Sequence, residues 1–226
     1  MKGSQGASID TQATDGYLSR VLSRAGAIVK RAIDVAGAAT VLVASSPILA
    51  AAAAAVRVTM GSPVLFSHQR PGLRGEPFVL YKLRTMKRVP GAEGDPKTDA
   101  ARLTKLGQFL RKVSIDELPQ LVNVLKGDMS LVGPRPLMMQ YLPRYNAHQA
   151  RRHDVKPGIT GWAQVNGRNT LSWEEKFDLD VWYVDNQSLW LDTKILAMTV
   201  LRVVRPAGIS AGQHATMPEF MGTPTH

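Results

Sequence analysis

The longest apolar stretch of the chain covers residues 35–56 and contains no charged residue. About 20 consecutive apolar residues are enough for a helix to cross a bilayer. Ser46 and Pro47 interrupt the stretch near its middle, where proline lacks the N–H that a helix needs and serine can satisfy the freed carbonyl. Basic residues flank both ends, and such flanks prefer the cytoplasmic side of a membrane. We therefore expect residues 29–58 to form a re-entrant membrane helix that is broken at Ser46 and Pro47.

Two other interpretations of this stretch stay open. One is a plain transmembrane helix, and the other is an alanine-rich helix buried in a protein core. Asp34 directly precedes the stretch, and we expect it to pair with Lys30 or Arg31, which lie about one helical turn earlier.

Shorter patterns downstream predict an α+β fold that is mainly helical. Residues 62–69 and 77–86 are rich in branched and aromatic residues, and the Gly/Pro/Arg-rich loop between them predicts a small β-hairpin. Turns around one short strand are expected at residues 156–169. Helical spacing of apolar residues predicts helices over 102–112, 115–126, 172–186 and 188–204.

The helix expected at residues 188–204 is apolar nearly all round after Lys194. It suits a helix lying in the membrane interface, with Trp182 and Trp190 at the level of the lipid headgroups. A buried core helix explains the same pattern equally well.

The ends of the chain lack periodicity. We expect residues 1–28 to be a disordered or poorly ordered lead, because residues 1–16 are polar and lack periodicity. These residues also lack the charged and apolar regions of a signal peptide. We expect residues 206–226 to be an extended tail. Between them lie the membrane helix at 29–58 and a domain with interfacial helices at 59–205.

Composition narrows the class of partner. The 226 residues carry a formal net charge of +10, which favours an anionic partner such as a membrane surface, a phosphorylated substrate or nucleic acid. Platforms that bind single strands interleave aromatic and basic residues, and aromatic residues make up only 6% of this chain. We therefore expect no nucleic-acid partner. The chain has no cysteine, which excludes disulfides and thiolate chemistry.

Two adjacent carboxylates, Asp116 and Glu117, follow the basic residues Arg111 and Lys112. Ser114 stands three residues before Glu117, which is the S-x-x-E pattern of a capping box. The acids would then lie in the first turn of a helix, where the helix dipole favours an anion. A helix cap alone explains them without any chemistry.

Histidine suggests no metal site. The five histidines lack a metal-ligand spacing such as H-x-x-x-H, and none is assigned a role; they are His68, His148, His153, His214 and His226.

Several motifs together favour a catalytic role for Asp116 and Glu117 over a helix cap alone. They are KRAIDV with the Ser-Pro break, GSPVLFSHQRPG, FVLYKLRTM, LTKLGQFLRKVSIDELPQLVNVLKGDMSLVGPRP, KPGITGWAQVNGR and WYVDN followed by SLWLD. With these motifs the chain resembles the bacterial sugar transferase family of monotopic phosphoglycosyl transferases over about residues 29–204. The HATMPEF tail is similar to small single-domain members that act on N-acetylated or diacetamido UDP-sugars.

The resemblance implies transfer of a phosphosugar from a UDP-sugar to polyprenol (undecaprenyl) phosphate, with release of UMP, at the cytoplasmic face of the bacterial inner membrane. It implies that Asp116 is a nucleophile forming an aspartyl phosphosugar, in a ping-pong reaction that begins glycoconjugate assembly. It also implies that Glu117 is a ligand of Mg²⁺.

The resemblance further assigns residues to substrate binding. Arg111, Arg135 and Arg168 match positions that contact the phosphates, and Lys82 matches an active-site lysine of the family. Pro134, Arg135 and Pro136 match the motif that seats the uridine. Asp180 also matches a family position, without a known role, and it could pair with Lys82 or a surface base.

Three rival functions stay open at this point. A non-enzymatic membrane-surface adaptor would use the basic face for lipid binding but has no use for Asp116. A nucleic-acid-binding protein leaves the apolar stretch unexplained. A hydrolase would keep the same site but pass the sugar phosphate to water.

Overall fold

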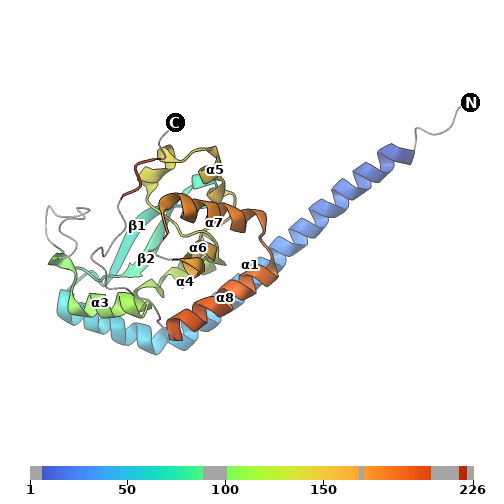
Figure 1. Cartoon of the computed structure of the whole chain (residues 1–226). Helices are drawn as coiled ribbons and strands as arrows, with labels where there is room; N and C mark the ends of the chain where they lie inside the picture. The colour runs from blue at the N-terminus through green and yellow to red at the C-terminus, as the bar shows by residue number, and fades with distance from the viewer. Residues whose placement is uncertain (1–6, 89–100, 168–170, 205–218, 223–226) are drawn as a thin grey trace, which may run out of the picture.

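One long helix, α1 (Ala7–Met60), begins the chain in the computed structural model, which describes residues 7–88, 101–167, 171–204 and 219–222. Alanine, the residue with the highest helix propensity, is frequent in its second half. In Figure 1 the first part of α1 points away from the rest of the molecule, and its last part runs along the underside of the domain. Where we predicted a disordered lead over residues 1–28, the structure therefore has helix from Ala7 onward.

Pro47 lies inside α1 and is accommodated by its neighbouring serines. Its missing N–H leaves the carbonyl of Val43, four residues earlier, without its helical donor. The Ser46 hydroxyl donates a hydrogen bond of 2.8 Å to this carbonyl, and the Ser45 hydroxyl donates one of 2.7 Å to the carbonyl of Val41. The predicted break is thus a proline within one continuous helix whose freed backbone group is satisfied locally. The re-entrant path stays a prediction.

Most of the apolar surface of α1 faces away from the protein. The side chains of Val43 and Ile48 are 74% and 54% exposed, whereas Ala38 and Val56 on the opposite stripe are fully buried. This exposure rules out an alanine-rich helix buried all round in a protein core. Within the described residues, Ala25–Met60 is the one helix long and apolar enough to cross a membrane.

The rest of the chain folds into short helices, turns of 3-10 helix and two small sheets against α1. In chain order the elements are β1 (Leu65–Pro71), η1 (Leu73–Gly75), β2 (Pro77–Leu83), α3 (Lys105–Lys112), η2 (Ile115–Glu117), α4 (Gln120–Lys126), β3 (Ser130–Val132), η3 (Met139–Arg144), α5 (Ala147–Ala150), η4 (Arg151–His153), β4 (Gly158–Thr160), α6 (Trp162–Asn166), α7 (Trp173–Asp185) and α8 (Leu189–Val204). Figure 1 shows β1 and β2 behind the helices, with α8 lying along α1.

The predicted hairpin is confirmed, since β1 and β2 pair antiparallel with Leu65 opposite Leu83. The helices predicted at 102–112, 172–186 and 188–204 are confirmed as α3, α7 and α8. Strand β3 was not predicted, and it pairs parallel with β4. The strand expected within residues 156–169 is β4. The later residues of this segment form the helix α6, where we expected a turn.

Two apolar clusters join α1 to the domain. Ala38 packs with Leu80, Leu121, Val124 and Met129, whereas Ala52 and Val56 pack with Leu83 and Leu110. Gly37 permits the close approach of α1 to β3, because a Cβ there would lie 2.8 Å from the Cδ1 atom of Leu131. Both parts of α1, before and after Pro47, therefore contact the domain that carries the candidate site.

Helix α8 is neither fully buried nor fully exposed. Leu191 and Ile195 are buried in a cluster with Val132, Val165 and Tyr183. Trp190 is 77% exposed on another face of α8. One face of α8 thus lies in the core and one apolar face is uncovered, and a position in the membrane interface stays a prediction.

Asp34 does not pair with Lys30 or Arg31, so that prediction is wrong. Its carboxylate is buried and accepts hydrogen bonds of 3.0 Å from the Ser130 hydroxyl and from the Leu131 backbone N–H. Lys30 forms an ion pair with Asp192 instead, and Arg31 donates to the last carbonyls of α4. The reason is tertiary, because β3 brings donors to Asp34 that the local sequence does not contain.

Candidate active site

Helix α3 positions the first cation of the candidate site. The Thr104 hydroxyl caps it by accepting from the Gly107 N–H. A Cβ on Gly107 would lie 1.9 Å from the Thr85 carbonyl oxygen, so only glycine lets α3 pack directly on this backbone. Four residues later, the Arg111 Nε donates a hydrogen bond of 3.0 Å to the Thr85 hydroxyl. The predicted site residue Arg111 is thus oriented from the end of a closely packed helix.

The prediction of a capping box at Ser114 is wrong, because the turn after α3 has a different geometry. Ser114 has left-handed backbone angles, with φ of 59°, and its side chain makes no capping bond. Ile115–Glu117 is a single 3-10 turn, and α4 begins only at Gln120 after Pro119. The left-handed turn, rather than a serine cap, directs the two acids.

Glu117 is held by two cations that come from different elements. Lys82 on β2 and Arg135, which follows β3, each lie 2.7 Å from Oε1 of Glu117. Burial opposes ionisation of this carboxyl, but Arg135 and Lys82 outweigh burial and hold its pKa well below the usual range. Three predicted site residues therefore form one cluster, with Glu117 ionised at its centre.

Asp116 behaves differently from its neighbour. It is buried, yet within the described parts of the chain its carboxylate has no hydrogen bond or ion pair. Burial raises its pKa, and the nearby Glu117 carboxylate adds to this effect. The charges of Lys82, Arg111 and Arg135 act in the opposite direction. A buried carboxylate that faces cations but is tied to none of them is free to contact another molecule.

The loop after β3 carries Pro134, Arg135 and Pro136 into the site. Its backbone is tied to the chain after η4, since the Gly158 N–H donates 3.0 Å to the Pro134 carbonyl. Proline on each side of Arg135 limits the backbone angles, which restricts where the guanidinium can point. The loop therefore delivers Arg135 to Glu117 from a constrained backbone.

Arg152 is a residue that sequence reasoning missed, and it explains Asp180. Arg152 is 2% exposed and lies 2.7 Å from Oδ2 of Asp180, which is also buried. The same nitrogen, Nη2, donates 2.7 Å to the carbonyl of Arg135. Asp180 therefore pairs with the buried Arg152, and the expected pairing with Lys82 or a surface base is wrong. It holds the arginine that supports the backbone of Arg135.

The sequence offered one weak signal for Arg152, the basic run Arg151–His153. It could not distinguish the neighbours. Arg151 is exposed and pairs with Asp185, whereas Arg152 faces inward beneath the aromatic rings of Tyr145 and Phe177.

A short part of the predicted tail belongs to this support. Phe220 is 2% exposed and packs with Tyr141 and Phe177, and Glu219 pairs with Arg144 at 2.8 Å. This part of residues 206–226 thus contacts the domain. Arg168, the remaining predicted site residue, lies outside the described residues.

Comparison with known proteins relates this arrangement to a family. A family model described as bacterial sugar transferase matches residues 25–206. The uncharacterized sugar transferase EpsL of Bacillus subtilis is 57% identical over 196 residues, which is 87% of this chain and 97% of the relative.

Longer relatives match as well. The UDP-glucose:undecaprenyl-phosphate glucose-1-phosphate transferase of Escherichia coli is 40% identical over 80% of this chain and 41% of its own length. The undecaprenyl-phosphate galactose phosphotransferase of Salmonella typhimurium is 38% identical over 84% of this chain and 43% of its own length. The chain spans less than half the length of these two relatives.

Proposed function

Because the chain belongs to the bacterial sugar transferase family, we propose that it moves a sugar 1-phosphate from a UDP-sugar to a polyprenol phosphate and releases UMP. Membership of the family makes the chain a transferase enzyme. The names of its relatives from Escherichia coli and Salmonella typhimurium support undecaprenyl phosphate as the acceptor. The non-enzymatic adaptor is therefore set aside.

One observation carries the proposal: two adjacent carboxylates have opposite environments. Glu117 is tied to Lys82 and Arg135, while Asp116 is buried near the same cations and has no hydrogen-bond or ion-pair partner among the described residues. A helix cap would need neither the cations nor the burial. A nucleophile needs the cations, because they keep its carboxylate ionised and because a diphosphate donor would otherwise be repelled by the acids.

In the first half-reaction, a carboxylate oxygen of Asp116 attacks the β-phosphorus of the UDP-sugar. The bond between this phosphorus and the oxygen that bridges to the α-phosphate breaks, and UMP leaves with that oxygen. The product is an aspartyl phosphosugar, in which the sugar 1-phosphate is an acyl phosphate on Asp116.

In the second half-reaction, a phosphate oxygen of the polyprenol phosphate attacks the same phosphorus. The bond from phosphorus to the Asp116 oxygen breaks, which restores the carboxylate and forms the polyprenol diphosphate sugar. The reaction is ping-pong, because UMP leaves before the acceptor reacts.

The cations have separate roles in this scheme. Arg135, between its two prolines, is placed to bind the donor, with Pro134 and Pro136 seating the uridine. Lys82 and Arg111 offset the negative charge of the diphosphate as it approaches Asp116. Arg168 is assigned to the phosphates by family resemblance.

Mg²⁺ fits this site if the phosphates of the donor supply part of its coordination. Magnesium is commonly bound by one or two carboxylates together with substrate phosphates and water. Within the described residues, no cluster of three or more His, Asp or Glu side chains could bind a metal alone. Both ion pairs of Glu117 use Oε1, so Oε2 of Glu117 could hold Mg²⁺ beside a diphosphate. The ion would neutralise charge on the leaving phosphate.

The exposed apolar face of α1 supports association with a membrane. The basic flanks of this face and the family resemblance favour the cytoplasmic face of the bacterial inner membrane. The donor is soluble in water, and the acceptor carries its phosphate at the level of the lipid headgroups. A helix in the bilayer that contacts the catalytic domain along both its parts keeps the site at this boundary.

The test is release of UMP by the purified full chain in detergent with Mg²⁺ and undecaprenyl phosphate. The donor panel contains UDP-glucose, UDP-galactose and N-acetylated and diacetamido UDP-sugars. We expect Asp116→Asn to abolish release with the competent donor. Asp178→Asn is the matched control, because Asp178 is exposed and pairs with His148 far from the acids in sequence.

Two outcomes would contradict the proposal. Unchanged UMP release by a folded Asp116→Asn variant would remove the covalent mechanism. Multiple turnovers without polyprenol phosphate would show that water is the acceptor and that the chain is a hydrolase.

A further inference from the structure

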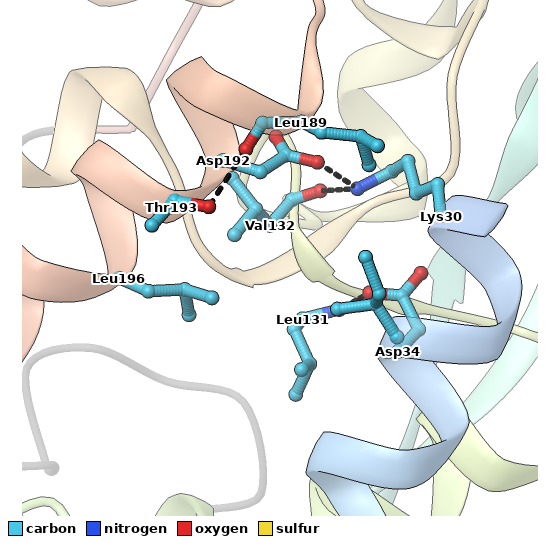
Figure 2. Close-up of a pocket in the computed structure, with 9 residues that line it drawn as sticks. Lys30, Asp34, Leu131, Val132, Leu189, Asp192, Thr193 and Leu196 are labelled. Atoms are coloured by element: carbon cyan, nitrogen blue, oxygen red, sulfur yellow. Dashed lines mark hydrogen bonds and ion pairs between the residues drawn. The ribbon is translucent and has the colours of Figure 1, made fainter. Parts of the chain in front are cut away.

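The membrane helix α1 contacts β3, the strand that precedes Pro134, Arg135 and Pro136. These three residues are called the donor loop. Lys30, on the last turns before the apolar stretch, forms an ion pair of 2.6 Å with Oδ2 of Asp192 on α8. The Lys30 ammonium also lies 3.4 Å from the carbonyl of Val132, the last residue of β3 (Figure 2). Helices α1 and α8 therefore meet at the end of β3 through a charged contact.

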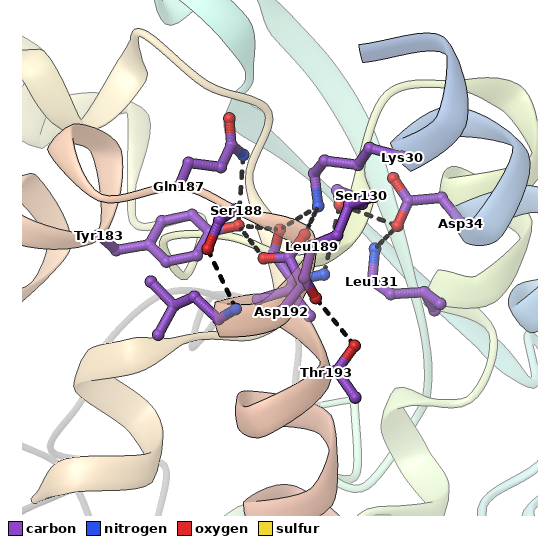
Figure 3. Close-up of polar contacts among 12 residues, drawn as sticks. Lys30, Asp34, Ser130, Leu131, Tyr183, Gln187, Ser188, Leu189, Asp192 and Thr193 are labelled. Carbon is purple, nitrogen blue, oxygen red and sulfur yellow. Dashed lines mark hydrogen bonds and ion pairs between the residues drawn. The ribbon is translucent and has the colours of Figure 1, made fainter. Parts of the chain in front are cut away.

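Tyr183 on α7 completes this junction. Its hydroxyl lies 2.7 Å from Oδ1 of Asp192 and 3.1 Å from the Val132 carbonyl (Figure 3). Burial, with the Asp192 carboxylate beside it, raises the pKa of the Tyr183 phenol, so the hydroxyl stays protonated well above neutral pH. The Asp192 carboxylate thus binds both Lys30 and Tyr183 around one backbone carbonyl.

Asp34, one helical turn after Lys30, contacts the other two residues of the strand. It accepts from the hydroxyl of Ser130 and from the backbone N–H of Leu131, both at 3.0 Å (Figure 3). Every residue of β3 therefore contacts a charged side chain of α1. The position of this strand depends on where α1 lies.

A small cavity lies beside these polar contacts. A cavity of about 30 Å³ lies between α1, β3 and α8, bordered by Lys30, Asp34 and Asp192 (Figure 2). Space of this size is enough for one water molecule. The side chains of Lys30 and Asp192 are only 18% and 10% exposed, so separating them would leave two poorly solvated charges.

A shift of β3 would reach the donor loop, because the backbone between them is tightly packed. Gly133 directly follows the strand, and a Cβ there would lie 2.3 Å from the Lys156 carbonyl. The Gly133 N–H donates 2.9 Å to the Thr160 carbonyl of β4. Arg135 is two residues further on and contacts Glu117. A displacement of the end of β3 would therefore also move the Arg135 guanidinium, which binds the donor in the proposed function.

We propose that Lys30, Asp34, Asp192 and Tyr183 are positioning residues that make binding of the donor nucleotide depend on the position of α1 against α8 and β3. The proposal rests on the proposed function and deepens it. The bilayer-embedded helix assembles the site for the water-soluble donor. Donor binding is therefore weakened when α1 leaves its place, which protects the UDP-sugar from unproductive reaction away from the acceptor.

The first experiment measures UDP binding by calorimetry to the full chain in nanodiscs with Mg²⁺ and without acceptor. UDP is the probe because it contains the nucleotide and diphosphate that the loop would bind. We expect Lys30→Met and Tyr183→Phe to weaken UDP binding at least tenfold and threefold. Lys30→Arg should stay within threefold of the unchanged chain. Lys194→Met is the matched control, because this exposed lysine lies on α8 over Trp162 and should change nothing.

A charge exchange separates positioning from general stability. Lys30→Asp combined with Asp192→Lys restores the ion pair in reverse and should bind UDP better than either single variant. In turnover assays, the Michaelis constant for the donor should rise while that for undecaprenyl phosphate stays within twofold. Tyr183→Phe removes only one hydroxyl, so it provides a folded variant if the charged ones unfold.

Outcomes for the two proposals are distinguishable. UDP binding that stays within twofold in folded Lys30→Met and Tyr183→Phe variants overturns the positioning role, whatever the turnover. Equal loss of turnover with unchanged donor constants also overturns it. Absence of UMP release by the unchanged chain contradicts the proposed function alone, because UDP binding is measured without turnover.

Discussion

Asp116 and Glu117 are neighbours of almost the same chemistry, and their surroundings shift the pKa values of their carboxyl groups in opposite directions. Two cations share one oxygen of Glu117, which lowers its pKa, while burial raises the pKa of Asp116. Neither effect follows from the order of residues along the chain. Lys82 and Arg135 are 35 and 18 residues away from Glu117 in sequence, and only folding brings them to it.

The buried pair of Arg152 and Asp180 leads to a prediction at the residue scale. Asp180→Asn leaves the Arg152 guanidinium buried without its carboxylate, so the free energy of unfolding should fall by about 3–5 kcal/mol. The double variant Arg152→Met with Asp180→Leu replaces both charges by apolar groups and should recover most of this stability. Thermal unfolding of each variant checks the expectation.

The activity of the same variants should not follow their stability. The double variant still lacks the donor of 2.7 Å to the Arg135 carbonyl, so UMP release should remain at least tenfold below that of the unchanged chain. Full activity in the stable double variant would show that Arg152 contributes only to folding. Arg151→Met with Asp185→Leu is a control, because that pair is exposed.

His153 leads to a prediction about pH. Burial, with Arg152 next to it, lowers the pKa of this histidine to about 4, against 6.5 for an ordinary histidine. The unfolded chain therefore binds the proton first, and the folded state loses stability as pH falls below 6.5. Between pH 7 and pH 5 this group should cost about 2 kcal/mol in the free energy of unfolding.

Urea unfolding of the unchanged chain and of His153→Gln at both pH values measures this effect. The variant should lose about 2 kcal/mol less than the unchanged chain over this interval. An identical pH dependence in the two proteins would assign the acid sensitivity to other groups. His148→Gln is the control, because His148 is exposed and lies beside Asp178.

At the element scale, the turn between α3 and η2 decides how the acids are presented. Ser114 occupies the left-handed region, which costs a residue with a Cβ roughly 1 kcal/mol and costs glycine little. A serine cap would have left Ser114 extended and placed the acids on a longer helix. The observed turn instead ends α3 and changes the direction of the chain within three residues.

Ser114→Gly tests this difference. In the observed turn, glycine removes the left-handed strain, and thermal unfolding should show equal or slightly higher stability, by up to about 1 kcal/mol. A capping box would give the opposite sign, because replacing a capping serine by glycine costs about a few tenths of a kcal/mol. Ser172→Gly is the matched comparison, since Ser172 makes a true capping box with Glu175 and should destabilise α7.

At the scale of the whole molecule, α1 relates the catalytic domain to the membrane. Its apolar stripe is uncovered, and its polar residues at Lys30 and Asp34 contact the domain. A helix of 36 residues, Ala25–Met60, is about 54 Å long, whereas a bilayer core is about 30 Å thick. A bent path with both ends on one side accommodates this length without burying the basic flanks.

Cysteine accessibility tests the re-entrant path directly, because the chain has no cysteine of its own. Ala27→Cys and Thr59→Cys lie on exposed positions on either side of the apolar stretch. In sealed inverted vesicles, an impermeant maleimide should label both single-cysteine variants, and in intact spheroplasts it should label neither. Labelling of the two positions from opposite sides would establish a transmembrane helix instead.

The sequence by itself determined the elements that depend on local chemistry. Branched and aromatic residues around a Gly/Pro/Arg-rich loop located the β1–β2 hairpin, and helical apolar spacing located α3, α7 and α8. The motif blocks located Asp116, Glu117 and Arg135 in one family pattern. The proline site in α1 was also visible, because the freed carbonyl and its serine donor lie within four residues.

Only the tertiary structure decided the contacts that join distant segments. The partners of Asp34, Asp180 and Glu117 come from other elements, so no local pattern could identify them. The same holds for the parallel pairing of β3 with β4 and for the burial of Arg152 rather than Arg151. A charged residue buried in a protein requires a partner, and the fold as a whole, not the neighbouring sequence, determines which partner is within reach.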